Sequence, residues 1–330
     1  MLSIDRFKRR SKLISPILRR FALLSGLSAL RARRQGVPRI LMLHAVGGEG
    51  QETVYPYNHA YQTRVFEAEL RYISRHFSIV PLDRIVERSR RGDTEGCREL
   101  ALTFDDGLRN SITVAYPILR RLALPATFFV CPELIESGGW QWANEISARL
   151  GHLSPAERTD LLPRVGAPTE SLDGVLRWMT NLDTARRVTT QRRIFAATSH
   201  FAPTPTEHFL FDTMTWQELT SLDSNLITVG SHSMSHPILS KTGPEQLTYE
   251  IVESRRVLES RLERPIKYFC YPDGAYDDSV VKLVRQEYLA AVTTEVGCVS
   301  GSDDIHLLPR IAAGEEDVHD LAWRLHRPNS

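Results

Sequence analysis

Two segments of the chain carry side chains that could perform hydrolytic chemistry. Asp105 and Asp106 follow the apolar run Leu100–Leu102, where a buried strand would end. His232 and His236 follow a second apolar run, residues 226–230. One carboxylate and two imidazoles form a ligand set for a metal ion that leaves room for water, and the second carboxylate is a natural base for that water.

Such a site would favour hydrolysis of an amide or an ester. A bound cation lowers the pKa of its water and polarises a carbonyl, so attack would produce a tetrahedral oxyanion. Two histidines four positions apart lie on one side of the chain if the segment is helical. With 11 histidines in 330 residues, this spacing alone is weak evidence. Its position after a strand end is what makes it informative.

The elements that must position these residues alternate along the chain. Short apolar runs follow one another with helical patterns between them, which predicts parallel strands in an α/β fold, and about eight strands favour a closed or nearly closed barrel. The expected strands are Ile40–Leu43, Phe77–Val80, Leu100–Phe104, Thr127–Val130, Leu226–Val229, Ile266–Phe269, Ala290–Thr293 and Leu307–Ile311; the expected helices include Thr63–His76, Asn110–Leu122 and Pro244–Glu263.

A helical insertion interrupts this alternation at about residues 138–212. Its periodic stretches predict helices at roughly Ser154–Leu162, Leu172–Asn181 and Thr184–Ala196. Four tryptophans lie in or beside it, and we favour an aromatic core over a sugar-stacking platform for them: Trp140, Trp142, Trp178 and Trp216.

Residues 1–36 differ from the rest of the chain. They contain ten of the 41 Lys and Arg but one of the 40 Asp and Glu, so residues 37–330 carry a formal charge of −8. That body is a poor match for nucleic acid, whose binding depends on cationic side chains. Pro16 to about Gln35 predicts a partly amphipathic basic helix suited to peripheral membrane contact; a helix docked on protein and a signal peptide are the alternatives. We therefore expect two units, 1–36 and a barrel at 37–330.

The four cysteines are widely spaced and form no CxxC pair. Unpaired, buried cysteines in a reducing compartment are the expected arrangement. We expect a cytoplasmic protein, peripheral at the inner membrane, with export as the alternative.

The two segments resemble the first and second motifs of the polysaccharide deacetylases of the NodB-homology type (carbohydrate esterase family 4). The resemblance covers roughly Arg39–Ala313 outside the insertion. It implies that Asp105 is the catalytic base and that the metal ligands are Asp106, His232 and His236. It also implies a distorted (β/α) barrel, a divalent ion that is most often Zn²⁺, and removal of acetyl groups from N-acetylated amino sugars.

Residues Phe269–Gly274 resemble the family's third motif. This implies that the backbone N–H of Tyr271 helps to hold the oxyanion and that its ring lines the groove. Many members carry an arginine here that tethers the catalytic aspartate, and this chain does not. We expect Arg310, on the last strand, to supply that tether.

The proton donor for the leaving amine has no clear candidate. The family's Leu-x-x-His motif has no clean copy. His306 precedes the last strand and should lie on its entry side, whereas His44 should lie at the correct rim or in the core. Outside the motifs, we expect Asp277-Asp278 to cap a helix. We also expect a solvated ion-pair face formed by Arg255, Arg256, Glu250, Glu253 and Glu259.

The sequence thus predicts a metal-dependent N-deacetylase of cell envelope polysaccharide biosynthesis. Its substrate would be an acetamido-sugar glycan or a lipid-linked precursor. The alternatives are a catalytically silent barrel that binds glycan or scaffolds an assembly complex, and a deformylase or other amidase of the same fold.

Overall fold

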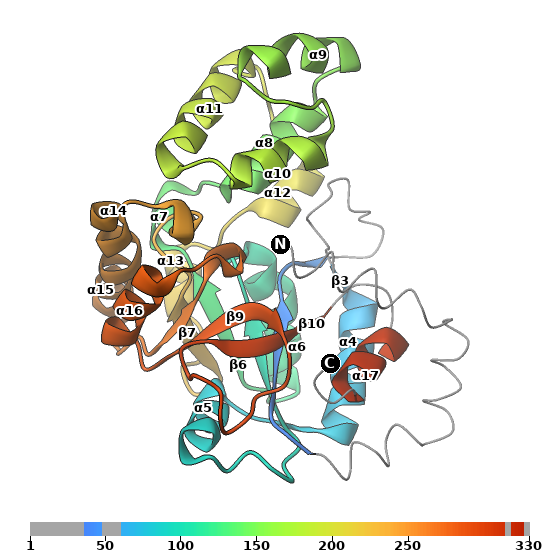
Figure 1. Ribbon diagram of the computed structural model, residues 1–330. Coiled ribbons are helices and arrows are strands. Elements are labelled where there is room, and N and C mark those ends of the chain that lie inside the picture. Colours follow the sequence, from blue (N-terminus) through green and yellow to red (C-terminus); the bar gives the residue numbers. More distant parts are fainter. Residues whose placement is uncertain (1–35, 48–60, 314–317, 327–330) are drawn as a thin grey trace.

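Seven parallel strands close into a barrel in the computed structural model, which describes residues 36–47, 61–313 and 318–326 (Figure 1). Their order around the ring is β1-β10-β9-β8-β7-β6-β5, and β5 pairs back with β1. The strands are β1 (Arg39–Leu43), β5 (Glu99–Phe104), β6 (Ala126–Val130), β7 (Ile227–Ser231), β8 (Tyr268–Cys270), β9 (Ala290–Val296) and β10 (Leu308–Ala312). The predicted distorted (β/α) barrel is confirmed.

The eighth predicted strand lies outside the ring. β4 (Ser78–Ile79) pairs with the first two residues of β5 and goes no further. A small parallel sheet also joins β2 (Val46–Gly47) to β3 (Tyr61–Gln62).

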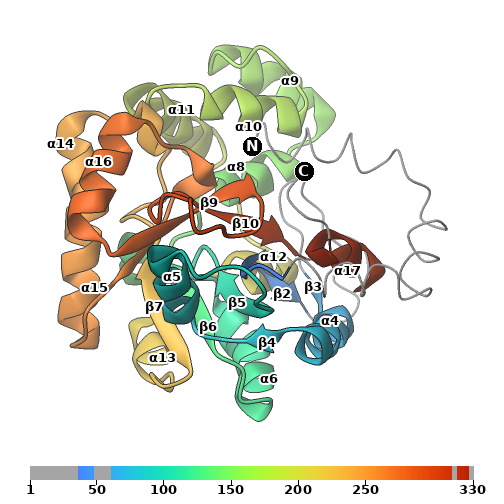
Figure 2. The same cartoon turned by 60° about the horizontal axis from the view of Figure 1, so that its bottom comes forward.

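Helices surround the barrel, as Figure 2 shows for α4, α6, α13, α15 and α16. Outside the insertion the helices are α4 (Thr63–His76), α5 (Leu82–Arg91), α6 (Tyr116–Arg121), α7 (Pro132–Ser137), α13 (Trp216–Thr220), α14 (Pro244–Thr248), α15 (Ser254–Leu262), α16 (Asp278–Glu287) and α17 (Val318–His326), with short turns η2 (Leu239–Lys241) and η4 (Pro272–Gly274). Two expected helices contain π-helical turns, η1 (Ser111–Ala115) and η3 (Tyr249–Glu253).

Strand alternation divides the core into two parts. Residues on one face of each strand fill the barrel interior, including Ala101, Tyr268, Cys270 and Leu308, and α5 contributes to the same cluster. Their neighbours, among them Phe269, pack outwards against the helices. Because successive side chains point to opposite faces, this alternation decides which residues at each strand end face the barrel axis.

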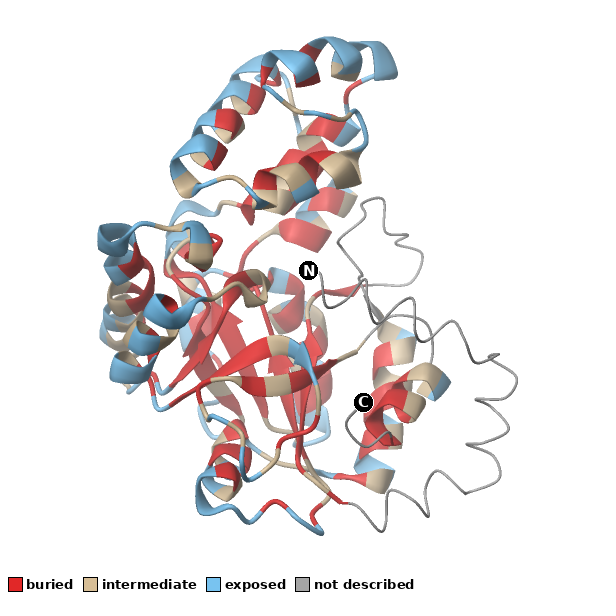
Figure 3. Ribbon diagram, in the orientation of Figure 1, coloured by how far each residue is buried: buried red, intermediate tan, exposed pale blue. Residues whose placement is uncertain are grey.

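Of the helices between β6 and β7, five lie within the predicted insertion. They are α8 (Trp142–Gly151), α9 (Pro155–Arg164), α10 (Leu172–Thr180), α11 (Thr184–Ala197) and α12 (Pro205–Phe211). They stand over the carboxyl ends of the strands, and their outer faces are largely exposed (Figures 1 and 3). Their core includes Ile146, Leu162, Val175 and Ile194, and it also takes in Ile238, two residues after His236. The insertion therefore packs against the loop that carries the candidate metal ligands.

The helix ends follow local sequence signals. Ser154 and Glu157 form a capping box at the start of α9, and Asp277 accepts hydrogen bonds from the backbone of Ser279 and Val280 at the start of α16. The predicted cap at Asp277 is confirmed.

The basic N-terminal helix predicted within residues 1–36 lies outside the described residues, as does its membrane contact. In the described part of the chain, no helix combines the length and the apolar character needed to cross a bilayer.

Candidate active site

Asp106, His232 and His236 converge at the carboxyl end of the barrel. The Nε2 atoms of His232 and His236 lie 3.4 and 3.3 Å from Oδ1 of Asp106. All three side chains are buried, with 9%, 2% and 2% of their surface exposed. Their potential ligand atoms fall within 4.8 Å of one another, close enough for one cation to contact all three. The structure thus brings the predicted ligands together.

The two histidines approach each other through a loop and not through a helix. The backbone φ angles of Ser233 and His236 are +65° and +59°, and the two imidazole centroids are 4.7 Å apart. Asp106 also has a positive φ, +70°. Left-handed residues other than glycine are costly, about 1–3 kcal/mol each in strained positions, and they cluster at functional sites.

Neighbouring groups orient both histidines and fix the position of the ring proton on His232. Nδ1 of His232 lies 2.8 Å from the carbonyl oxygen of Cys270 and must donate to it, so in the neutral imidazole the lone pair of Nε2 faces Asp106. The side-chain amide of Gln141, just before α8, lies 3.1 Å from Nδ1 of His236. Burial disfavours the charged carboxylate of Asp106, but its contacts with His232 and His236 and the charges of His236 and His44 hold its pKa well below its usual range.

Asp105 is held by Arg310, as the sequence predicted. The guanidinium donates from Nη1 to Oδ1 at 2.8 Å and from Nη2 to Oδ2 at 2.7 Å. Arg310 is itself fixed by the carbonyl of Thr293 and the hydroxyl of Thr103. Burial disfavours the carboxylate form of Asp105, but the charge of Arg310 outweighs it and lowers the pKa. Asp105 is therefore an ionised, rigidly oriented carboxylate.

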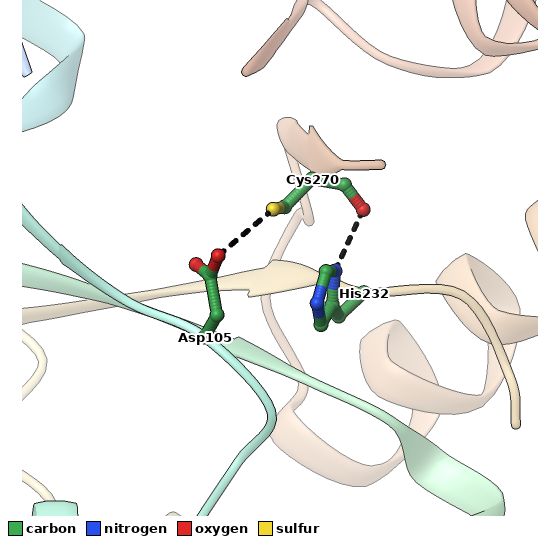
Figure 4. A group of neighbouring side chains, drawn as sticks. All are labelled: Asp105, His232 and Cys270. Atoms are coloured by element: carbon green, nitrogen blue, oxygen red, sulfur yellow. Dashed lines mark hydrogen bonds between the residues drawn. The ribbon is translucent and has the colours of Figure 1, made fainter. Parts of the chain in front are cut away.

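Cys270 completes a second group of potential metal ligands with Asp105 and His232 (Figure 4). Its Sγ lies 3.5 Å from Oδ2 of Asp105 and 3.2 Å from Nη2 of Arg310. Both carboxylate oxygens of Asp105 already accept from Arg310, and Nδ1 of His232 is committed to a carbonyl. Burial also raises the pKa of the Cys270 thiol, which disfavours the thiolate that a metal would need. The group around Asp106 fits a cation better.

The prediction for Tyr271 is wrong. Its ring is fully buried in the outer core and its hydroxyl donates to the carbonyl of His306, so it lines no groove. Its backbone N–H donates to the carbonyl of Val292 at 3.3 Å. β8 ends at Cys270, and alternation turns Cys270 toward the barrel interior and Tyr271 away from it.

The two histidines considered as proton donors lie at opposite ends of the barrel. Nε2 of His44, directly after β1, is 4.0 Å from Oδ2 of Asp105, and its side chain is 44% exposed. Nε2 of His306 lies 3.0 Å from the carbonyl of Tyr288, which precedes β9. His306 is therefore at the amino ends of the strands, far from the candidate ligands, and His44 is not a core residue.

Glu250 is a residue that the sequence assigned wrongly. It is 1% exposed and belongs to no solvated face. Its carboxylate accepts from the backbone N–H groups of Met234 and Ser235 and from the Ser235 hydroxyl, which fixes the loop between the two histidines. The pairs Arg255–Glu259 and Arg256–Glu253 do form on the same helical segment, as expected.

The model of the polysaccharide deacetylase family matches residues 92–158 and 180–292, more than half of the chain. This chain belongs to that family. The matched ranges contain both aspartates, both histidines and Glu250, and they leave out residues 159–179 of the insertion.

Individual relatives agree with this assignment. YxkH of Bacillus subtilis (strain 168), whose name places it among polysaccharide deacetylases, is 24% identical over 99 residues, which are 30% of this chain and 36% of that protein. The chain thus matches about a third of the length of this relative.

Solved structures share the fold. The Streptococcus pyogenes deacetylase PplD, in complex with acetate, superposes with a TM-score of 0.61 at 18% identity over 88% of this chain and 99% of that one. IcaB from Ammonifex degensii gives a TM-score of 0.57 at 16% identity over 88% and 98% of the two chains.

Proposed function

We propose that this protein is a divalent-metal-dependent hydrolase that removes N-acetyl groups from an amino-sugar glycan or its lipid-linked precursor. The observation that carries the proposal is the convergence of Asp106, His232 and His236 beside the tethered carboxylate of Asp105. Membership of a deacetylase family supports the reaction class. Zn²⁺ is the ion we expect, because two imidazoles and one carboxylate suit it.

Asp106, His232 and His236 would hold the ion. The fit rests on Nε2 of His232, whose lone pair in the neutral imidazole faces the Asp106 carboxylate, and on the burial of all three groups. When bound, the cation would lower the pKa of water in the site and polarise the acetyl carbonyl.

The remaining chemistry belongs to the chain itself. Asp105 is the general base, since its carboxylate is ionised and its position is fixed by the two hydrogen bonds from Arg310. Arg310 is a positioning residue that keeps this carboxylate charged inside the barrel. His44, the exposed imidazole at the same rim, is the group we assign to protonate the departing amine.

The experiment is a product assay on the purified, Zn²⁺-loaded protein. N-acetylglucosamine oligomers should release acetate and free amine, and chelation of the metal should abolish the release. Formate release from formylated substrates, without acetate release from acetylated ones, would identify a deformylase instead. Metal binding without any hydrolysis would favour the silent glycan-binding barrel.

Location is a separate part of the proposal. We place the enzyme in the cytoplasm, with contact to the inner membrane through residues 1–36 and export as the alternative. Cell fractionation of the full chain and of a form that lacks residues 1–36 tests this.

A further inference from the structure

Two side chains of the insertion carry buried hydrogen-bond donors that lack acceptors. Arg187, on α11, is 3% exposed, and Trp142, at the start of α8, is 7% exposed. Nε and Nη1 of Arg187 and Nε1 of Trp142 have no hydrogen-bond partner among the described residues. Arginine and tryptophan can only donate, so these three groups require an acceptor.

The two donors form one cluster. The guanidinium carbon of Arg187 lies 5.1 Å from the centre of the Trp142 ring, within the range of a cation–π contact. An unpaired buried guanidinium is unfavourable, and proteins seldom keep one without a compensating anion.

The acids whose charges act on Arg187 do not supply this acceptor. Burial lowers the pKa of Arg187, and the negative charges of Asp273 and Glu250 act in the opposite direction. The Glu250 oxygens, however, are already taken by backbone N–H groups and side chains of its own loop and helix. Neither acid forms a hydrogen bond or an ion pair with Arg187 in the described structure.

The cluster lies beside the candidate metal centre. Gln141, which precedes Trp142 in the chain, contacts the imidazole of His236. The negative charge of Asp273, in the turn after β8, acts to raise the pKa of both His236 and Arg187. The insertion that carries both residues of the cluster stands over the carboxyl end of the barrel (Figure 1).

We propose that Arg187 and Trp142 form a subsite for an anionic group, a carboxylate or a phosphate, carried by the sugar substrate. The inference rests on the proposed function and narrows it to acidic or phosphorylated acetamido sugars. A planar guanidinium and an indole N–H would together supply donors to two oxygens of the anion. Neutral acetamido sugars would leave the donors unsatisfied and bind less tightly.

The test measures binding by calorimetry in the Zn²⁺-loaded full chain that carries Asp105→Asn, so that ligands are not consumed. The probes are N-acetylglucosamine, N-acetylmuramic acid, N-acetylglucosamine 1-phosphate and inorganic phosphate. At least one anionic sugar should bind about tenfold more tightly than the neutral one. The carboxylate and phosphate probes distinguish the two sources of the anion.

Three further substitutions show which residues produce the preference for the anionic sugar. Arg187→Met should abolish the preference for the anionic sugar and leave binding of N-acetylglucosamine unchanged. Trp142→Phe should weaken the preference several-fold. Arg192→Met, at an exposed position of the same helix, should behave like the parent.

Several results would overturn the inference. These are equal binding of neutral and anionic sugars by the parent, a preference that survives in Arg187→Met, or tight binding of inorganic phosphate without any preference among the sugars. Arg187→Met should also keep or raise Tm, because it removes an unpaired buried charge; a large drop would show a structural role instead. Acetate release by the wild-type enzyme is measured separately, so a failed deacetylase assay with an intact anion preference would reject only the proposed function.

Discussion

His44 occupies a position from which it could pass a proton to a leaving group. It is exposed at the rim and lies 4.0 Å from the Asp105 carboxylate. His44→Gln should slow amide hydrolysis by about 10²-fold or more, the usual contribution of a general acid. An aryl acetate, whose leaving group needs no proton, should lose less than about fivefold. Steady-state rates on both substrates decide this, and equal losses on the two would contradict the assignment.

Arg310 acts through Asp105 and not on the substrate. Arg310→Lys keeps the charge but cannot reproduce the paired hydrogen bonds, so kcat should fall by about 10–100-fold through loss of alignment. Zn²⁺ affinity should be unchanged, because Arg310 contacts none of the three proposed ligands. Calorimetric metal binding beside kcat provides the check, and a variant with full activity would reject the tether.

At the scale of the element, the loop after β7 depends on Glu250. Glu250→Ala would leave two partly buried backbone N–H groups without their acceptor, so the free energy of unfolding should fall by roughly 2–4 kcal/mol. Zn²⁺ affinity should fall as well, because the loop carries His236. Denaturant unfolding and metal titration measure the two effects. Glu253→Ala, on the same π-helical turn, is the control, because the partly exposed Glu253 pairs with Arg256 and not with the loop. Equal effects in both variants would contradict the role of Glu250.

The helix α17 is docked by a buried neutral histidine. Burial, together with the positive charge of Arg39 and the nearby His76, lowers the pKa of His326 to about 4, while its Nε2 lies 2.7 Å from the hydroxyl of Tyr72. In the unfolded chain the pKa returns to its ordinary value of 6.5, so protons bind there first as the pH falls.

The stability that His326 contributes is therefore complete above pH 6.5 and is lost as the pH falls from 6.5 toward 4. Its loss should amount to on the order of 1–3 kcal/mol. Unfolding free energies of the wild type and of His326→Gln, compared across this pH range, isolate the contribution of His326 to stability. A difference between them that does not change with pH would contradict it.

The accuracy of the predictions made from the sequence differed between elements. Asp105, Asp106 and the two histidines were identified because each pair follows an apolar run, and Arg310 because it lies on the last strand. Tyr271 was assigned from its resemblance to the third motif, which does not show which face of the strand the residue takes; β8 ends at Cys270, and alternation turns Tyr271 outward.

Glu250 was assigned to the wrong face of its helix. The π-helical turn η3 shifts the helix face by one residue, which regular helical periodicity does not anticipate. Gln141 and Arg187 carry no motif at all, since their roles depend on how the insertion packs over the barrel. Nothing local in the sequence could have revealed them.

At the scale of the whole molecule, barrel closure creates the site. β1 pairs with both β5 and β10, so Arg310 meets Asp105 across the interior although 205 positions separate them. The loop after β7 then brings His232 and His236 to Asp106 from another side of the same rim. The insertion adds contacts to His236 and Ile238 from above.

Zn²⁺ binding, measured by calorimetry in the wild type and in single variants, tests most directly the roles of Asp105 as the base and of Asp106 as a metal ligand. Asp105→Asn should still bind one ion per chain while acetate release falls by about 10³-fold or more. Asp106→Asn and His232→Ala should lose both the ion and the activity. Loss of the ion in Asp105→Asn with full binding in Asp106→Asn would contradict the proposed centre.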